Sequence, residues 1–430
     1  MAMQRTPLLM SNILDRGAQV APNEEIVTAT ESGVRRQTYK QTRDRAHQLA
    51  HALAAAGIQV GDRVGTFMWN GSRHLEAYHA CAGMGAVLHT LNIRLGEKDL
   101  EYIINHAEDQ VIIADADILP LLEKMVGKIP SVRQVIVATE EGFAGWSTQL
   151  PNPIDYEDFI KDQPTDYAWP QIDENSPLGL CYTSGTTGNP KGVEYEHRSQ
   201  YLHTLTCAMT DSMALSGADS VCGIVPMFHA MGWGIPWSAL MLGCKQVMPH
   251  RFMDPARLLD LMVAEKVTLS AGVPTIWQGV KGLYEANPDA YDLSSLSRLT
   301  CGGSSPPPSL IRWFWDELDV EMIQGWGMTE TSPLATLSRR VMKRSQLSIG
   351  EDQQFENVAK AGLLMPGLEL DIFDEELTMR QQLADKGFHL AFWSENGWRN
   401  FATKEVAARA PDQRSGEKTR SRRPTSRSYE

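Results

Sequence analysis

The sequence predicts an α/β protein in which helices cover stacked, mainly parallel sheets, with a small β subdomain. Three observations predict this class. Short apolar runs alternate along the chain with segments whose apolar residues recur at helical spacing. The runs occur in two series, which indicates two sheets. Gly- and Pro-rich stretches end several of the runs, at the position where open α/β sheets bind their ligands.

The first series of runs predicts one sheet and two of its helices. The buried strands of this series are expected at 63–69, 86–92, 110–115 and 133–139. The segments 45–57 and 72–85 have apolar residues at helical spacing and end at glycine, which predicts two helices. Alternation of strand and helix favours largely parallel pairing.

The second series predicts another sheet and a composite pocket. Its strands are expected at 178–184, 221–226, 245–249, 267–274 and 298–304. The segment 255–266 predicts an amphipathic helix between two of them. Three stretches, TSGTTGNP, PMFHAMGWGIP and CGGSSPPPS, lie at the ends of these strands. We therefore expect their loops to line one site.

Composition and charge limit the classes of function. The 430 residues suffice for two or three packed units, and the net charge of −13 argues against a nucleic-acid partner. The six cysteines form no CxxC pair, which indicates buried free thiols in a reducing compartment. His203 and Cys207 share a helical face, but two ligands do not make a zinc site. With no signal peptide and no membrane span, we predict a soluble cytoplasmic protein.

The stretch YTSGTTGNPKGV, residues 182–193, is the first candidate for binding phosphate. A Walker A loop is excluded, because it has lysine directly after its second glycine, whereas Asn189 and Pro190 separate Gly188 from Lys191. The loop still offers hydroxyl donors and glycines that permit close backbone approach, at Thr183, Ser184, Gly185, Thr186, Thr187 and Gly188. These groups suit a mobile diphosphate. The alternative, a flexible linker, fits poorly with the apolar strand before it.

This stretch resembles the signature loop of the AMP-forming adenylating enzymes, the superfamily of acyl-CoA synthetases, luciferases and peptide-synthetase adenylation domains. VPMFHAMGWG, CGGSSPPPS and IQGWGMTETSP resemble the family's PxFHxxG, GGAPxxP and xxYGxTE segments, in the family's order. WNGSRHLEAYHACAGMGAVLHTLNIRL resembles the N-terminal half of fatty acyl-CoA ligases, particularly the medium-chain type. The resemblance covers about residues 7–375 and implies a large N-terminal adenylating domain.

The resemblance implies a nucleotide site with a metal ion. Glu330 occupies the position of a Mg²⁺ contact, and a carboxylate suits such a hard cation. Thr329 would hydrogen-bond the α-phosphate, and Trp326 would stack on adenine, where many relatives have tyrosine. The remaining nucleotide-binding positions are the phosphate-loop residues 183–188 together with Gly302, Gly303, Ser304, Gln324, Gly325, Gly327 and Met328. The implied catalytic residues are Lys191, His229, Thr329 and Glu330.

The segment MFHAMGWG implies the substrate side of the site. His229 would border the carboxylate substrate and the path of the incoming thiol, with gating and positioning favoured over proton transfer. Trp233, Gly234 and Trp237 follow it and would form an apolar slot that suits an acyl chain. Core packing is the alternative explanation for these residues, so the length of the acyl chain is left open.

The family pattern weakens from about residue 377. GWRNFATKEVAARAPD only faintly resembles the family's GWFxTGDVAxxDxDG, and it places Glu405 where relatives have a ribose-binding aspartate. The family's hinge motif and C-terminal lysine are not found, so we expect the mobile C-terminal domain to be missing. The adenylating domain would end near 410. The basic residues 411–430 would form a disordered tail.

The resemblance implies an acid–thiol ligase that uses ATP, Mg²⁺ and CoA. A carboxylic acid, most simply a medium- or long-chain fatty acid, would attack ATP to give acyl-AMP and pyrophosphate, and CoA would then displace AMP. An aryl or short thioether acid is an alternative substrate. A non-catalytic remnant that binds nucleotide or acyl groups is an alternative of a different class. A homodimer is the assembly we would test first.

Overall fold

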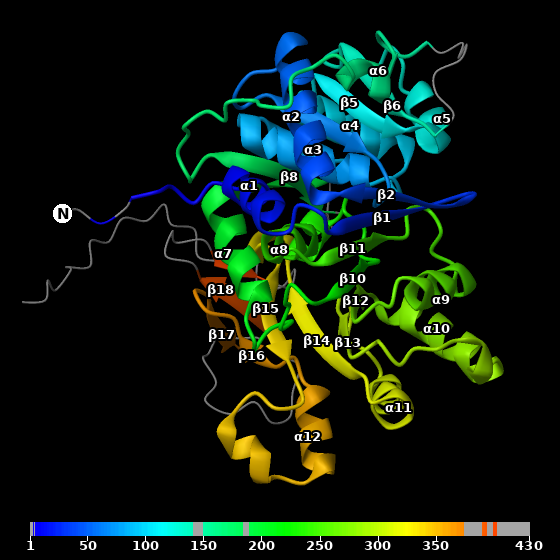
Figure 1. The fold of residues 1–430 in the computed structure, drawn as a ribbon. Helices are drawn as coiled ribbons and strands as arrows, with labels where there is room; N and C mark the ends of the chain where they lie inside the picture. Colours follow the sequence, from blue (N-terminus) through cyan, green and yellow to red (C-terminus); the bar gives the residue numbers. More distant parts are fainter. Residues whose placement is uncertain are drawn as a thin grey trace, which may run out of the picture. The chain divides into compact units, whose positions relative to one another are not determined.

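The computed structural model describes residues 3, 5–140, 149–183, 189–373, 389–393 and 399–401. The chain divides into two compact units, Met1–Met365 and Pro366–Glu430 (Figure 1). The first unit contains two large sheets, and in its described residues no helix is long and apolar enough to cross a membrane. All six cysteines lie in this unit and are buried free thiols, as predicted.

The seven-stranded sheet, counted over the described residues, contains the first predicted series. Its spatial order is β7 (Ile154–Asp155), β6 (Gln134–Ala138), β5 (Val111–Asp115), β3 (Arg63–Phe67), β4 (Val87–Thr90), β8 (Pro177–Thr183) and β9 (Lys191–Glu196). All neighbours pair in parallel except β8 and β9. Every residue of β5 is buried, as expected for a central parallel strand covered on both faces.

The nine-stranded sheet, again within the described residues, contains the second series except its first strand. The strand expected at 178–184 is β8 of the seven-stranded sheet instead, where it pairs with β4. The order of the nine-stranded sheet is β16 (Leu363–Leu364), β15 (Leu334–Ser338), β14 (Glu321–Gly327), β13 (Arg298–Cys301), β12 (Leu269–Gly272), β10 (Ser220–Gly223), β11 (Lys245–Met248), β1 (Glu25–Thr30) and β2 (Gly33–Thr38). The strands from β14 to β1 are parallel, and both edges are antiparallel. Parallel strands end at one edge, which brings their loops together.

Helices form three layers around the sheets. The α-helices are α1 (Ser11–Val20), α2 (Tyr39–Ala55), α3 (Ser72–Met84), α4 (Glu97–Ala107), α5 (Leu119–Glu123), α6 (Tyr156–Ile160), α7 (His197–Ala208), α8 (Ile235–Leu242), α9 (Pro255–Ala264), α10 (Pro274–Ala286), α11 (Pro308–Leu318) and α12 (Glu351–Val358). The short 3₁₀ segments are η1 (Ala116–Ile118), η2 (Ala230–Gly234), η3 (Pro288–Ala290), η4 (Thr329–Thr331) and η5 (Arg344–Ser348). Figure 1 shows α3 between the two sheets, with α9, α10 and α11 beside the nine-stranded sheet.

Burial explains this layering. All residues of α3 except Arg73 are buried, because one face packs toward each sheet. A second cluster joins α9, α10 and α11 to the nine-stranded sheet through residues such as Leu258, Trp277 and Phe314. A third joins α4 and α5 to the outer face of the seven-stranded sheet. The two layered, mainly parallel sheets predicted from the sequence are therefore confirmed.

Some elements differ from the sequence prediction in extent. Helix α2 begins at Tyr39 rather than at 45, because Thr38 and Gln41 form a capping box that adds a polar first turn. The β1–β2 hairpin, β14 and β15 were not predicted. The GWG segment in β14 has two glycines, which are depleted in strands, so its propensity hides the strand.

The second unit contains a three-stranded antiparallel sheet in its described residues. The strands are β17 (Glu369–Phe373), β18 (His389–Trp393) and β19 (Arg399–Phe401), in that order. The predicted loss of family pattern near 377, the boundary at 410 and the basic tail at 411–430 lie outside the described residues.

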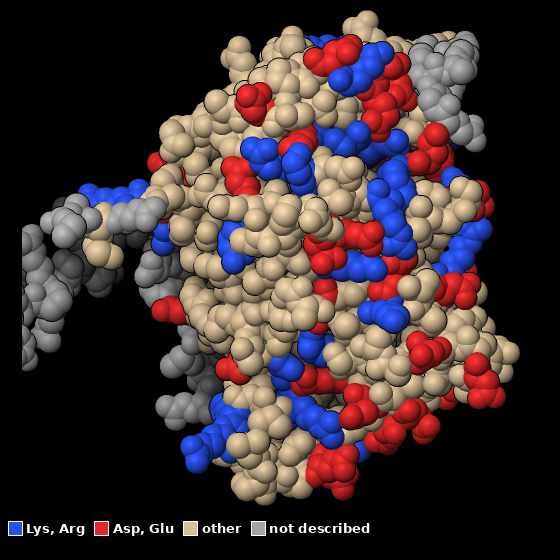
Figure 2. Space-filling view, viewed as in Figure 1, with Lys and Arg blue, Asp and Glu red and all other residues tan. Residues whose placement is uncertain are grey.

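Charges of both signs are interspersed on the face drawn in Figure 2. Ion pairs in the described residues include Arg36 with Glu265 at 2.6 Å and Arg251 with Glu31 at 2.8 Å.

Candidate functional site

Three of the predicted motifs meet at one cavity of about 80 Å³. The cavity lies where β13 and β14 of the nine-stranded sheet end, beside the loop that follows β10. Its lining is Met213, His229, Ala230, Trp233, Thr300, Gly302, Gly303, Gly325, Trp326, Gly327, Met328, Pro333 and Leu334. Sequence reasoning had assigned His229 and Trp233 to the acid, and the glycines and Trp326 to the nucleotide. The structure brings both sets together.

Two glycines permit the close approach of the strands that form the cavity. A Cβ on Gly302 would lie 2.8 Å from the Gly325 carbonyl oxygen and 3.0 Å from the Trp233 ring. A Cβ on Gly327 would lie 2.0 Å from the Pro333 carbonyl oxygen. Real side chains do not reach such distances, so both positions require glycine. These glycines therefore let the strands and the Trp233 ring pack closely around the cavity.

Thr300 lines the cavity and is left without a partner among the described residues, as is Gln324 in the adjacent strand β14. Thr300 Oγ1 and Gln324 Oε1 are buried and, among the described residues, accept or donate no hydrogen bond. Gln324 uses its amide nitrogen for a weak contact with Ser305 Oγ at 3.4 Å. Buried polar atoms normally have partners, so such atoms indicate a place for a polar ligand. The Thr300 hydroxyl is therefore a candidate hydrogen-bond partner for a ligand in this cavity.

Thr329 and Glu330 lie directly after this strand, in η4. The Met328 N–H donates to the Pro333 carbonyl at 3.1 Å, and this bond closes the turn that carries them. Glu330 is exposed, so its carboxylate is free to bind a cation. Its charge also helps to raise the pKa of Tyr195 in β9, for which burial is the main cause. That influence places Glu330 near the β8–β9 hairpin.

The phosphate-loop motif is the connection of that hairpin. Thr183 ends β8 and pairs with Lys191, the first residue of β9. The Lys191 side chain is exposed at the base of the loop. The predicted loop residues Ser184, Gly185, Thr186, Thr187 and Gly188 lie outside the described residues, as does Glu405.

His229 lines the cavity and remains accessible to solvent. Partial burial of the ring lowers its pKa, and the nearby positive charge of Arg94 lowers it further. The imidazole is therefore neutral at neutral pH, with one nitrogen free to accept a proton or a hydrogen bond.

Trp237, Gly234 and Ser304 lie apart from the cavity lining. Trp237 is fully buried in the core, with its ring centroid 4.5 Å from that of His79. A Cβ on Gly234 would meet His203 Nδ1 at 2.5 Å, so this glycine makes room for a core histidine. Ser304 is exposed beyond Gly303. Core packing, the alternative stated above, accounts for Trp237.

Sequence reasoning missed three residues that organise the site. His203 Nε2 accepts a hydrogen bond from the Leu334 N–H at 3.2 Å and so fixes the start of β15 beside the cavity. Burial lowers the pKa of His203 to about 3, so it stays neutral and able to accept this bond. Thr300 and Asn70 are the others. No local pattern could reveal them, because their surroundings come from distant parts of the chain.

The fold and the cavity are those of a layered α/β protein whose candidate ligand site lies at the carboxyl ends of its parallel strands. A profile described as AMP-binding enzyme matches residues 14–384. The chain belongs to the AMP-binding enzyme family, and the predicted resemblance is confirmed.

Two relatives share much of the sequence. The chain is 40% identical over 375 residues to the medium-chain-fatty-acid–CoA ligase of Ectopseudomonas oleovorans, which covers 87% of this chain and 68% of the relative. It is 36% identical over 428 residues to the 3-methylmercaptopropionyl-CoA ligase of Ruegeria lacuscaerulensis, covering 95% and 78%. The chain thus spans about two thirds to three quarters of the length of these relatives.

Solved structures confirm the fold. The anthranilate CoA ligase AuaEII with anthranoyl-AMP matches with a TM-score of 0.78 at 23% identity, over 93% of this chain and 72% of that one. The long-chain-fatty-acid-CoA ligase FadD1 of Archaeoglobus fulgidus matches with a TM-score of 0.77 at 19% identity, over 94% and 78%. At these identities the match supports the architecture alone.

Proposed function

We propose that this protein activates a carboxylic acid with ATP to form acyl-AMP and pyrophosphate, and then transfers the acyl group to CoA. One observation carries the proposal: His229 and Trp233 from one motif share a cavity with Gly302, Gly303 and Trp326–Met328 from two others. An adenylating enzyme needs this combination, because the acid must reach the α-phosphate of a bound nucleotide. The ligase relatives support the same chemistry.

The chain's own residues would act mainly by position and charge. In the first step, a carboxylate attacks a phosphate, so two anions must meet. The Thr183 hydroxyl, the Lys191 ammonium and the Thr329 hydroxyl would face the phosphates as fixed donors. Glu330 would hold Mg²⁺, and the bound ion would neutralise phosphate charge. Trp326 would stack on the adenine, and Gln324 Oε1 would accept from its exocyclic amine.

His229 would act at the meeting point of acid and nucleotide. Because burial and Arg94 lower its pKa, the ring adds no charge at neutral pH. The neutral imidazole can orient the incoming carboxylate, and in the second step it can accept a hydrogen bond from the CoA thiol. Gating and positioning stay our preferred roles for it.

The substrate is proposed to be a medium- or long-chain fatty acid. Met213, Trp233 and Leu334 give the cavity an apolar wall, which suits an alkyl chain. A short thioether acid is the second candidate, favoured by the 36% identity over 428 residues to a ligase for such an acid. A homodimer and a cytoplasmic location stay predictions.

Acid-dependent pyrophosphate–ATP exchange tests the first step, and thioester formation with CoA tests the second. Fatty acids of C4 to C16 and a thioether acid would be compared in parallel. Exchange that requires both acid and Mg²⁺ supports the proposal. Nucleotide binding with no exchange for any acid would support the non-catalytic alternative instead.

A further inference from the structure

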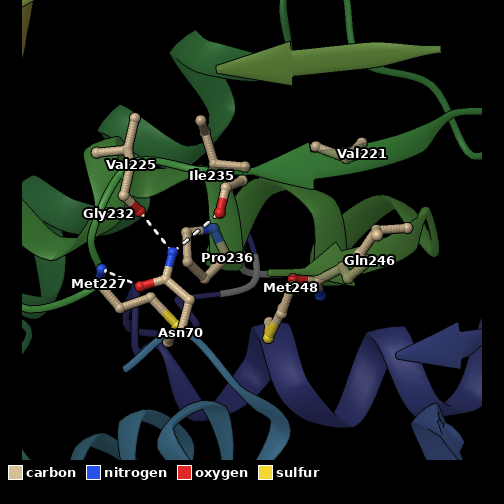
Figure 3. Close-up of a pocket in the computed structure, with 11 residues that line it drawn as sticks. Asn70, Val221, Val225, Met227, Gly232, Ile235, Pro236, Gln246 and Met248 are labelled. Carbon is tan, nitrogen blue, oxygen red and sulfur yellow. Dashed lines mark hydrogen bonds between the residues drawn. The ribbon is translucent and has the colours of Figure 1, made fainter. Parts of the chain in front are cut away.

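Asn70 links the seven-stranded sheet to the loop that carries His229 (Figure 3). It lies between β3 and α3 and is only 2% exposed. Figure 3 shows its side chain pointing at the backbone of the segment that follows β10, beside Val225 and Met227. A cavity of about 20 Å³, room for about one water, adjoins this contact.

The side-chain amide of Asn70 uses both of its donors and its acceptor. Nδ2 donates to the Gly223 carbonyl at 2.9 Å and to the Val225 carbonyl at 2.7 Å. Oδ1 accepts from the Met227 N–H at 2.7 Å. An aspartate of the same shape has no donor for the two carbonyls, and an apolar residue would leave three buried backbone groups without a partner. The contact therefore requires an asparagine.

Tyr78 makes a second side-chain hydrogen bond to the backbone of Met227. Its hydroxyl donates to the Met227 carbonyl, so side chains fix both backbone groups of this residue. Both residues belong to the β3–α3 region, Asn70 in the connection and Tyr78 in α3. The position of Met227 is thus set by two buried side chains outside its own sheet.

The backbone beyond Met227 is strained. His229 follows two residues later, and η2 comes directly after it. In η2 the residues with a Cβ have positive φ: 44° at Ala230, 52° at Met231 and 56° at Trp233. Successive left-handed residues are disfavoured for L-amino acids. Such a turn persists only where its surroundings hold it.

We propose that Asn70 is a positioning residue for the acyl-activating reaction: through the Gly223–Met227 segment it holds the left-handed turn that places His229 and Trp233 at the cavity. The expected effect of Asn70 on kcat rests on the proposed function. The effect of Asn70 on the position of His229 does not depend on that function. The two parts can therefore be tested separately.

The kinetic test uses Asn70→Asp in the full chain, with Tyr78→Phe as a second variant. A misplacement of His229 by about 1 Å is expected to lower kcat for acid-dependent pyrophosphate exchange about 10²-fold in Asn70→Asp. Tyr78→Phe removes one bond and keeps the ring, so a smaller loss in kcat is expected. The KM for ATP should stay within about twofold in both, because β13 and β14 are untouched.

Ser270→Ala is the matched control. Ser270 Oγ donates to the Cys222 carbonyl at 2.8 Å, so this variant also removes one buried side-chain bond to β10. It leaves the Gly223–Met227 segment alone, and its kcat should equal that of the parent. If all three variants lose stability and none loses kcat, Asn70 is merely structural and the proposal is overturned. If Asn70→Asp does not fold, Tyr78→Phe decides by the same criterion.

The second readout does not depend on turnover. Diethyl pyrocarbonate modifies neutral histidine, and peptide mass spectrometry follows His229 across pH 5 to 8. Release of the turn should expose the ring further and move its modification midpoint up toward the ordinary pKa of about 6.5. If the parent protein showed no exchange activity, the proposed function would be refuted. The pH dependence of His229 modification would still test whether Asn70 positions His229. An unchanged profile in both variants would overturn the positioning role.

Discussion

The cavity and the buried carboxylate of Glu76 differ in whether their polar groups have hydrogen-bond partners. Glu76, on α3 between the sheets, has no exposed surface and accepts from three side chains: Gln37 at 2.8 Å, Arg45 at 2.8 Å and Tyr156 at 2.6 Å. Thr300 Oγ1 at the cavity, and Gln324 Oε1 in the adjacent strand β14, have no partner among the described residues. A satisfied group stabilises the fold, whereas an unsatisfied one is available to a ligand. The two regions should therefore respond differently to substitution.

The largest effect on stability is expected from Glu76→Ala. It leaves the half-buried Arg45 without one of its carboxylates and the Gln37 amide without one of its two acceptors, at a cost of about 3–5 kcal/mol in the free energy of unfolding. Urea unfolding followed by circular dichroism measures this. Activity per folded molecule should be unchanged. Glu97→Ala, which removes an exposed ion pair with Lys128, is the control and should have little effect. Equal stability of the two variants would break the comparison.

Glu330→Gln should give the largest effect on activity. Loss of the charge that would hold Mg²⁺ is expected to lower kcat/KM about 10²–10³-fold, by analogy with the loss of other preorganised charges. Because Glu330 is exposed, the melting temperature should not change. Glu317→Gln, at an exposed position of α11, is the matched control for charge. If Glu330→Gln retained full activity at limiting Mg²⁺, the assignment of the metal position would be wrong.

Some features of these regions could be predicted from the sequence, and others could not. Strands such as β5 were predictable because their signal is a local apolar run, and the nucleotide motif because its letters are contiguous. Asn70 was not predictable, because its partner Gly223 lies 153 residues away and only the packing of two sheets brings them together. Trp237 is large and apolar, as a residue that lines an acyl slot should be, yet its position in α8 buries its side chain in the core. Local patterns therefore predicted elements, and tertiary contacts decided which side chains line the site.

Thr300→Val should separate the effect of the Thr300 hydroxyl on stability from its effect on ligand binding. The change keeps the shape and removes a buried hydroxyl that has no partner in the described part of the chain. We expect unfolding to cost about 1 kcal/mol more, and the affinity for acyl-AMP or ATP to fall about fivefold, since the ligand loses one hydrogen bond. Calorimetry of a non-hydrolysable acyl-AMP analogue measures the affinity. Thr300→Ser keeps the hydroxyl and should bind normally. Unchanged affinity in Thr300→Val would mean that the hydroxyl does not face the ligand.

The smallest effect is a shift in the pH profile. Burial and the charge of Arg94 lower the pKa of His229, so the neutral ring persists at pH values where an ordinary histidine is protonated. If neutral His229 is the active form, kcat/KM should fall only as the pH drops below about 6.5. Arg94→Gln removes the positive charge and should move that acidic limb to higher pH. The direction follows because a cation nearby disfavours the imidazolium, and its removal makes protonation easier. An acidic limb at the same pH in both proteins would show that another group controls it.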